Sequence, residues 1–272
     1  MDAATIQNPI EFAPVPADGR RDGLVIVCDH ASNAVPDWVE PLGLPSGDMA
    51  RHIAWDVGAR GLTLELARLL AAPAVLSTWS RLVIDPNRGE QDPTLVMKLY
   101  DGSVIPGNRG VDAGETLLRI ERLHRPYHHA IDRALEEQVA ASRAPALISI
   151  HSFTPQLRGR PIRPWHIGVL WDQDDRLATP LLARLANESD LVVGDNEPYS
   201  GALAGDCMWQ HGTDRDIPHA LIEVRNDLIA TPEDQIAWAA RLAPIIEGAL
   251  SDLWLADPEP ATPTLKTGET HG

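Results

Sequence analysis

Histidines follow two short apolar segments of this 272-residue chain, and histidine is a residue type that binds metal ions and moves protons. His30 comes just after the apolar run Gly23–Cys28, and His151 directly follows Ala146–Ile150. Two histidines and one carboxylate form the zinc site of many hydrolases, where an open position holds water. We therefore predict that His30 and His151 bind one divalent ion, the alternative being that each forms hydrogen bonds inside the core.

The sequence leaves the third metal ligand open. Asp56 lies in the short polar and glycine-containing segment His52–Gly58, before an expected helix, and is our first candidate. Asp29, next to His30, is the second candidate. A zinc ion held in this way lowers the pKa of its bound water toward about 7, which produces a nucleophile at neutral pH.

Glu223 is an acidic residue inside an otherwise apolar segment, Ala220–Val224. Burying an unpaired carboxylate costs several kcal/mol, so this residue needs either a partner or a chemical role. We predict that Glu223 accepts a proton from the activated water and passes it to the leaving nitrogen. The competing interpretation is a salt bridge with Arg225, because residues i and i+2 of a strand share a face.

Asn87 and Arg88 follow the apolar residues Leu82–Ile84 and suit a substrate that carries a carboxylate. An arginine grips a carboxylate with two parallel hydrogen bonds, and an asparagine adds a third. The alternative is that Arg88 is a solvated residue of a surface turn.

Further polar residues are expected around the same site. Tyr199, in the loop Asn196–Gly201, is expected to contact the substrate, and His211 to stabilise an oxyanion. We also place Asn33 and Ser152 among the substrate-binding residues.

His124 and His128 are four residues apart on an expected helix, a spacing that zinc sites also use. The motif His-Glu-x-x-His is absent there, so this spacing does not predict a zinc site. We expect Tyr127, His128 and His129 to pack or to be solvated, the alternative being that they face the domain and line the pocket.

The elements that must position these residues alternate between strands and helices. The expected strands are Gly23–Cys28, Ala74–Leu76, Leu82–Ile84, Ala146–Ile150, Ile167–Trp171 and Ala220–Val224. The expected helices are Gly61–Ala72, Asp112–Ser142 with a capping box of Asp112 and Glu115, Thr179–Asn187, and Pro232–Leu253 with Thr231 as N-cap. This alternation predicts an α/β fold with a mainly parallel or mixed central sheet and helices on both faces. Such sheets bind ligands at the carboxyl ends of their strands.

Composition excludes several classes of partner. The formal net charge of -16 argues against binding to nucleic acid or to an anionic membrane. No apolar run approaches the ~20 residues of a membrane-spanning helix, and no targeting segment follows Met1, so we expect a cytoplasmic protein. Cys28 and Cys207 lack the Cys-x-x-Cys spacing, which argues against a cysteine zinc site, and two cysteines in such a chain are more often reduced than joined.

We expect one catalytic domain over residues 1–256 and a disordered tail, rich in proline and threonine, over residues 257–272. The expected assembly is a monomer or a small homo-oligomer.

Seven segments of the chain together resemble the N-formylglutamate amidohydrolase family. They are Cys28–Pro36, His52–Ala59, Ser80–Gly89, Arg125–Ile131, Ser149–Pro155, Asn196–Gly201 and Ile222–Ile229. The resemblance implies a single phosphorylase/hydrolase-like domain, akin to zinc carboxypeptidases, with a zinc-bound water. It also implies His30 and His151 as ligands, Asn87 and Arg88 as the carboxylate grip, and Glu223 as the base.

The sequence departs from the carboxypeptidase-like relatives in one ligand position. Those relatives carry His-x-x-Glu, whereas the fourth position of this motif is Asn33 here. An amide oxygen is a poor replacement for a carboxylate on zinc. Either Asp56 takes the role of the third ligand or the site is altered.

The activity that the resemblance implies is zinc-dependent cleavage of an N-formyl or N-acyl amino acid such as N-formylglutamate, as in histidine degradation. The substrate would be a small carboxylate. One alternative is a hydrolase of short peptides, similar to carboxypeptidases. Another is a metal-free protein that binds small molecules, which metal analysis would distinguish from the enzyme.

Overall fold

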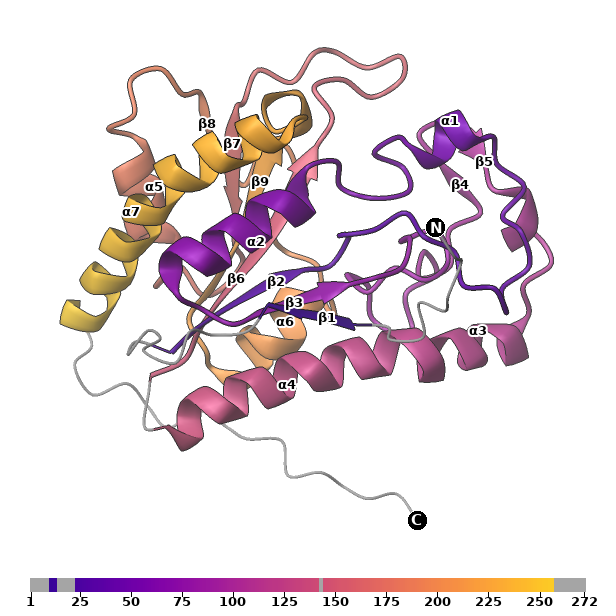
Figure 1. The fold of residues 1–272 in the computed structure, drawn as a ribbon, viewed down its shortest axis with the longest axis horizontal. Coiled ribbons are helices and arrows are strands. Elements are labelled where there is room, and N and C mark those ends of the chain that lie inside the picture. The colour runs from indigo at the N-terminus through magenta and orange to yellow at the C-terminus, as the bar shows by residue number, and fades with distance from the viewer. Residues whose placement is uncertain (1–9, 14–22, 142–143, 257–272) are drawn as a thin grey trace.

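A seven-stranded mixed β-sheet forms the centre of the computed structural model, which describes residues 10–13, 23–141 and 144–256 (Figure 1). In order across the sheet, the strands are β1 (Ile10–Ala13), β3 (Ala74–Ser77), β2 (Leu24–Cys28), β6 (Ala146–Phe153), β9 (His219–Arg225), β7 (Ile167–Leu170) and β8 (Val193–Asp195). Strands β3, β2, β6 and β9 are parallel, whereas β1 and β7 run antiparallel to β3 and β9. This confirms the predicted α/β fold with a mixed sheet.

Helices cover both faces of this sheet (Figure 1). One face carries α2 (Ala59–Leu70), α5 (Ala178–Leu185) and α7 (Pro232–Ala256), and the other carries α4 (Arg125–Ala140) and α6 (Cys207–His211). Strand β2 shows why an uninterrupted apolar sequence is needed. Leu24 and Ile26 pack into the core under the first group of helices, and Val25 and Val27 into the core under the second.

The long helix predicted over Asp112–Ser142 is divided by one π-helical turn. It consists of α3 (Ala113–Arg119), the π turn Ile120–His124 and α4. The Asp112 carboxylate accepts a hydrogen bond from the Glu115 backbone N–H, as the predicted cap requires. A π turn shifts the helical phase by one residue; here it ends at His124 and lies directly before α4, which carries His128.

The predicted strand Leu82–Ile84 is wrong. These residues are buried, but they lie in turns that close over the end of the sheet. Their backbone groups bond locally and to side chains rather than to a neighbouring strand: Val83 N–H donates to Ser80 O, and the carbonyl oxygens of Leu82 and Val83 accept from Asn108 and Arg119. Asn87 and Arg88 are therefore presented by a loop.

The remaining elements are short. They are α1 (Ser46–Met49), the hairpin of β4 (Leu99–Tyr100) and β5 (Ser103–Val104), and 3-10 turns at Pro106–Asn108, Thr213–Arg215 and Asn226–Leu228. The predicted tail, residues 257–272, lies outside the described residues. Within the described ranges, no helix has both the length and the apolar character needed to cross a membrane.

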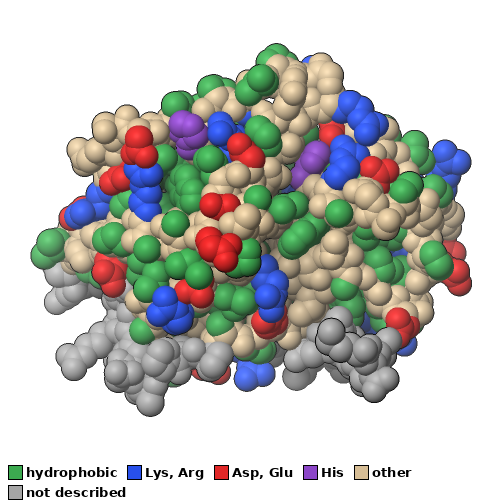
Figure 2. All heavy atoms as spheres, turned by 45° about the horizontal axis from the view of Figure 1, so that its top comes forward, with side chains coloured by type: hydrophobic (Ala, Val, Ile, Leu, Met, Phe, Trp, Pro, Cys, Tyr) green, Lys and Arg blue, Asp and Glu red, His purple; other side chains and the backbone are tan. Residues whose placement is uncertain are grey.

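Acidic and basic side chains are mixed over the molecular face shown in Figure 2, with apolar side chains between them. On that face the basic side chains stand singly or beside acidic ones and form no broad basic patch.

Gly58 is a backbone position that the fold needs in order to place the loop containing Asp56. Its φ is +84°, and a Cβ built on it would lie 2.2 Å from the carbonyl oxygen of Ile229. We expect Gly58→Ala to lower the free energy of unfolding by about 1–3 kcal/mol, measured by chemical denaturation, because it adds both strain and a clash.

Gly47→Ala is the matched control, because no atom lies within 4 Å of a Cβ built there. Its stability should stay within about 0.5 kcal/mol of the parent. Equal effects of the two substitutions would contradict the strain assigned to Gly58.

Candidate metal centre and substrate pocket

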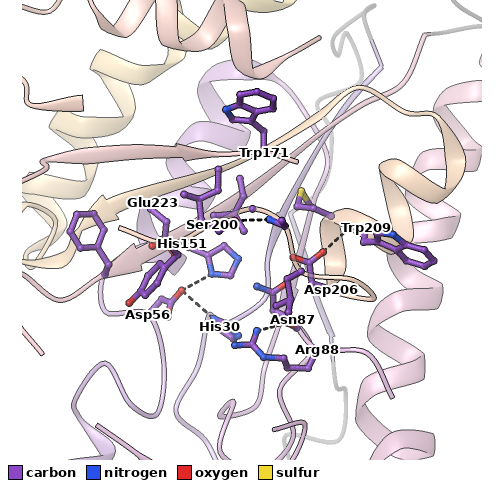
Figure 3. Close-up of a pocket in the computed structure, with 18 of the residues that line it drawn as sticks. His30, Asp56, Asn87, Arg88, His151, Trp171, Ser200, Asp206, Trp209 and Glu223 are labelled. Atoms are coloured by element: carbon purple, nitrogen blue, oxygen red, sulfur yellow. Dashed lines mark hydrogen bonds and ion pairs between the residues drawn. The ribbon is translucent and has the colours of Figure 1, made fainter. Parts of the chain in front are cut away.

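A pocket lies at the carboxyl ends of β2, β6 and β9, where the loops after these strands meet (Figure 3). Parallel strands end at the same edge of a sheet, so residues far apart in sequence converge there. Eight of the site residues predicted from sequence line this pocket, namely His30, Asp56, Asn87, Arg88, His151, Ser152, Tyr199 and Glu223.

His30, Asp56 and His151 form a buried cluster at the floor of the pocket (Figure 3). The Asp56 Oδ2 atom lies 3.2 Å from His30 Nδ1 and 2.8 Å from His151 Nδ1. The candidate ligand atoms of the three residues all lie within 4.8 Å of one another. Two imidazole nitrogens and one carboxylate oxygen are a donor set that zinc binds in hydrolases.

Asp29 lies behind His151 rather than among the candidate ligand atoms. Its Oδ2 atom accepts from His151 Nε2 at 2.8 Å and from Ser149 Oγ at 3.0 Å, and its Oδ1 atom accepts from Tyr127 Oη at 2.8 Å. Burial alone would raise the pKa of Asp29, but the hydrogen bonds from His151 and Tyr127 hold that pKa below its usual range. The sequence alternative of Asp29 as a metal ligand is therefore replaced by a role in orienting His151.

Asp85 supports His30 in the same way. Its Oδ1 atom accepts from His30 Nε2 at 2.7 Å and from Asn87 N at 2.9 Å, and its Oδ2 atom accepts from Arg81 Nη2 at 2.8 Å. Burial opposes the charge of Asp85, but Arg81 and His30 hold the pKa of this carboxyl well below its usual range.

The two outer carboxylates decide how the histidines face the cluster. Because Asp29 and Asp85 accept from the Nε2 atoms, the Nδ1 atoms of His151 and His30 both point at the Asp56 oxygen. In neutral imidazoles, these Nδ1 atoms present lone pairs to an oxygen that also carries lone pairs. Three acceptors directed at one region require a proton or a metal cation among them.

Glu223 stands beside His151, because the two residues are paired across the parallel strands β9 and β6. The side chain is buried, and its Oε2 atom has no hydrogen-bond partner among the described residues. Burial raises the pKa of Glu223 to about 7, although His151 and His30 act in the opposite direction. A salt bridge with Arg225 is not formed, since Arg225 Nε donates to Asp227 Oδ1 at 2.8 Å.

Asn87 and Arg88 lie on the opposite wall of the pocket (Figure 3). Asn87 Oδ1 accepts from the Cys207 backbone N–H at 3.1 Å, so its amide nitrogen is the group that can donate to a ligand. Arg88 Nε donates to Thr94 Oγ1 at 3.2 Å, and its Nη1 donates to the carbonyl oxygen of Asn87 at 2.6 Å.

Two histidines of the long helix hold the loop that carries Asn87 and Arg88. His124 Nε2 donates to the carbonyl oxygen of Arg88 at 2.8 Å, and His128 Nε2 donates to that of Pro86 at 3.0 Å. Both rings are buried. The two histidines, four residues apart on the helix, therefore hold the backbone of this loop. This role was not predicted from the sequence.

Ser152 and Tyr199 also line the pocket, but their polar groups already have protein partners. Ser152 Oγ donates to the carbonyl oxygen of Val57 at 2.8 Å, and Tyr199 Oη accepts from Arg163 Nη1 at 3.0 Å. Burial raises the pKa of Tyr199, so its hydroxyl stays neutral.

Two predicted site residues do not reach the pocket, and both expectations need correction. Asn33 Nδ2 donates to the carbonyl oxygen of Met49 at 2.9 Å. His211 lies on the side of α6 that faces α4, whereas Met208 and Trp209 of the same short helix line the pocket. The helical phase of α6 therefore directs His211 away from a bound substrate.

Sequence reasoning missed several residues that shape the pocket. Trp171 and Trp209 form apolar walls, and Asp206 lies between the pocket and α6 (Figure 3). Asp206 caps α6 by accepting from the Trp209 N–H at 2.7 Å, and burial raises its pKa to about 7. An N-cap followed by a five-residue helix gives too little periodicity to be recognised in sequence.

Comparisons with known proteins agree with this architecture. A family model described as N-formylglutamate amidohydrolase matches residues 22–230. The gene product Atu2144 from Agrobacterium tumefaciens has 34% sequence identity and a TM-score of 0.84, and the match covers 90% of this chain and 96% of that one. N-formylglutamate amidohydrolase from Ralstonia eutropha JMP134 has the same fold, at 21% identity, a TM-score of 0.62, and coverage of 88% and 98%. A search of curated proteins gives no match.

Asp85 is the buried residue on which both His30 and Arg81 depend. We expect Asp85→Asn to lower the free energy of unfolding by about 3–5 kcal/mol, because it removes the closer of the two carboxylates that contact the buried guanidinium of Arg81 and leaves only Asp56, at 3.6 Å. Chemical denaturation of parent and variant measures this difference.

The exposed pair of Asp190 and Arg241 provides a control for the loss of one carboxylate charge. Asp190→Asn should leave stability nearly unchanged, because water and salt screen the charges of an exposed pair. A loss for Asp85→Asn no larger than that of the control would contradict the structural role of Asp85.

Proposed function

The chain belongs to the N-formylglutamate amidohydrolase family, and so is a hydrolase that acts on amides; we propose that it uses a bound zinc ion to cleave an N-formyl or N-acyl acidic amino acid. N-formylglutamate is the first substrate to test. The observation that carries this proposal is the convergence of His30, Asp56 and His151 beside the unpaired carboxylate of Glu223. A place in histidine degradation and a cytoplasmic location stay predictions of the sequence resemblance.

The residues of the cluster fit a zinc ion, which the Nδ1 atoms of His30 and His151 and the carboxylate of Asp56 would hold. When bound, such an ion polarises the substrate carbonyl and lowers the pKa of water. Asp85 and Asp29 favour a bound zinc ion, because each accepts a hydrogen bond from the Nε2 atom of one histidine. The lone pair of that histidine's Nδ1 atom is then available for coordination.

Glu223 is suited to accept and deliver the proton. A group whose pKa is about 7 exchanges protons readily at neutral pH, and the free Oε2 atom can receive one. In the proposed reaction, Glu223 takes a proton from the water that attacks the carbonyl carbon. It then delivers that proton to the nitrogen as the carbon–nitrogen bond breaks, which yields a carboxylic acid and an amine; the acid then gives up its proton, so that the products are a carboxylate and an ammonium group.

Arg88 and Asn87 are suited to bind a carboxylate of the substrate on the wall opposite Glu223. Arginine and amide donors together select for a planar anion. Trp171 and Trp209 add apolar walls that keep water away from the reacting groups. These features support an acidic N-acyl amino acid over a neutral one.

Replacing Glu223 tests the assignment of the base. The parent protein, loaded with zinc, should hydrolyse N-formylglutamate to glutamate and formate, and Glu223→Gln should lower kcat by about 10²–10⁴-fold. The parent kcat should rise with pH and reach half of its maximum at or below about pH 7. The ionised carboxylate of Glu223 is the active form, its pKa is about 7, and a cation bound nearby would lower that pKa.

The zinc content of Glu223→Gln must equal that of the parent, since the residue is not among the proposed ligands. Turnover within a few-fold of the parent with zinc retained would refute the role of Glu223. Absence of zinc from the parent after metal supplementation would refute metal dependence itself.

Replacing Arg88 tests the carboxylate grip. We expect Arg88→Met to lower kcat/KM for N-formylglutamate by about 10- to 100-fold, since a hydrogen bond to a charged group contributes about 1.5–3 kcal/mol. Steady-state kinetics measures the change.

Arg125→Met is the matched control, because Arg125 pairs with Glu90 near the same loop but does not line the pocket. It should leave kcat/KM close to the parent value. A parent-like kcat/KM for Arg88→Met would show that the substrate carboxylate binds elsewhere.

A further inference from the structure

A second group of metal-binding side chains lies between α4 and α6, outside the lining of the pocket. It consists of His128, Cys207 and His211, all of them buried. One candidate ligand atom from each residue lies within 4.8 Å of the others. The residues come from two helices that are distant in sequence but pack together.

The outward-facing nitrogen of each histidine is occupied by an acceptor. His128 Nε2 donates to the carbonyl oxygen of Pro86 at 3.0 Å, and His211 Nδ1 lies 3.0 Å from the carboxylate Oδ1 of Asp132. A carbonyl and a carboxylate only accept hydrogen bonds, so both of these nitrogens carry hydrogen. This fixes which nitrogen of each ring faces the interior of the cluster.

The two inward-facing nitrogens point at each other. His128 Nδ1 and His211 Nε2 are 2.8 Å apart, the ring planes differ by 18°, and the centroids are 5.0 Å apart. Stacked rings cannot bring atoms this close, so the rings meet edge to edge and their nitrogen lone pairs face one another. Such a pair is stable only when a positive group, either an extra proton or a metal cation, lies between the rings.

The third side chain of the group favours the cation over the proton. A shared proton needs only the two facing nitrogens, whereas Cys207 adds a buried sulfur atom that a divalent cation binds as the thiolate. An acceptor behind each histidine is the arrangement typical of metal ligands.

We propose that His128 Nδ1, His211 Nε2 and Cys207 Sγ hold a second divalent cation of the zinc type, separate from the cluster of His30, Asp56 and His151. Two imidazoles and a thiolate suit borderline-soft ions such as zinc and cobalt. This inference does not rest on the proposed function. The sequence argument against a cysteine zinc site considered only neighbouring cysteines, whereas this site combines one cysteine with histidines of other segments.

The second cation would restrict the motion of the loop that carries Asn87 and Arg88, on the side of the loop that faces away from the pocket. His128 also bonds the Pro86 carbonyl, and the backbone N–H of Cys207 bonds the side chain of Asn87. A cation that ties His128 to Cys207 would therefore fix both attachments of the loop at once. The predicted role of this site is structural, with no contact to the substrate.

Cobalt loading tests the proposal, because a thiolate ligand gives cobalt(II) a charge-transfer band in the near ultraviolet. The full-length protein is stripped with a chelator and dialysed against Co²⁺ or Zn²⁺, and elemental analysis then gives the metal content. We expect two ions per chain in the parent, and one in Cys207→Ser and in His211→Gln. The sulfur band should be present in the parent and lost in Cys207→Ser.

Two controls separate this site from the pocket. Cys28→Ser removes the other cysteine of the chain and should keep the band, and His151→Gln should remove one ion and also keep the band. The proposal would be overturned if the parent lacked the sulfur band and Cys207→Ser had the same metal content as the parent. A proton shared by His128 and His211 would then explain their close approach. Should Cys207→Ser fail to fold, the band in the parent and in Cys28→Ser still reports ligation by Cys207. If the proposed function were wrong and the cluster of His30, Asp56 and His151 bound no metal, the parent would contain one ion per chain and would still show the sulfur band. That result would support the second site while refuting the first.

Discussion

Buried negative charge at the ends of the central strands is the constraint on which the rest of the structure depends. Asp29, Asp56 and Asp85 are almost completely buried, and among the described residues the guanidinium of Arg81 is the buried permanent cation that contacts this group. Three carboxylates and one guanidinium leave two formal negative charges if the histidines are neutral. Burial of that charge is unfavourable unless positive charge joins it. Protons on the histidines can supply it, and a divalent cation supplies it fully.

The fold creates this situation by covering both faces of the sheet. Strands β2, β6 and β9 are largely apolar because helices pack on each side, and most of the polar residues of β6 and β9 lie toward the carboxyl ends. Parallel neighbours bring those ends together, which places His30 and His151 close to each other and pairs His151 with Glu223. The loop of residues 78–98 then covers the cluster and contributes Asp85, Asn87 and Arg88.

The part of the site that follows from strand ends could be predicted from sequence. His30 and His151 follow apolar runs, and Glu223 interrupts one, so elementary burial arguments are enough to select them. Long-range packing decided the rest. The buried residues Leu82–Ile84 resemble a strand because local sequence cannot distinguish burial in a sheet from burial under a loop. The direction of His211 depends on the phase of a five-residue helix, which no sequence periodicity reveals.

The binding loop is held at successive backbone groups, which bears on how the pocket binds its substrate. Asp85 accepts from the Asn87 N–H, His128 donates to the Pro86 carbonyl, and His124 donates to the Arg88 carbonyl. A loop fixed at three consecutive residues loses little conformational entropy when a ligand arrives, so more of the interaction energy remains for affinity and orientation. Asp85 also bonds His30, so the same carboxylate positions a residue of the candidate metal centre and the loop that faces it. In the proposed function, the protein would therefore largely set the distance between the reacting carbonyl and the carboxylate of a substrate before binding.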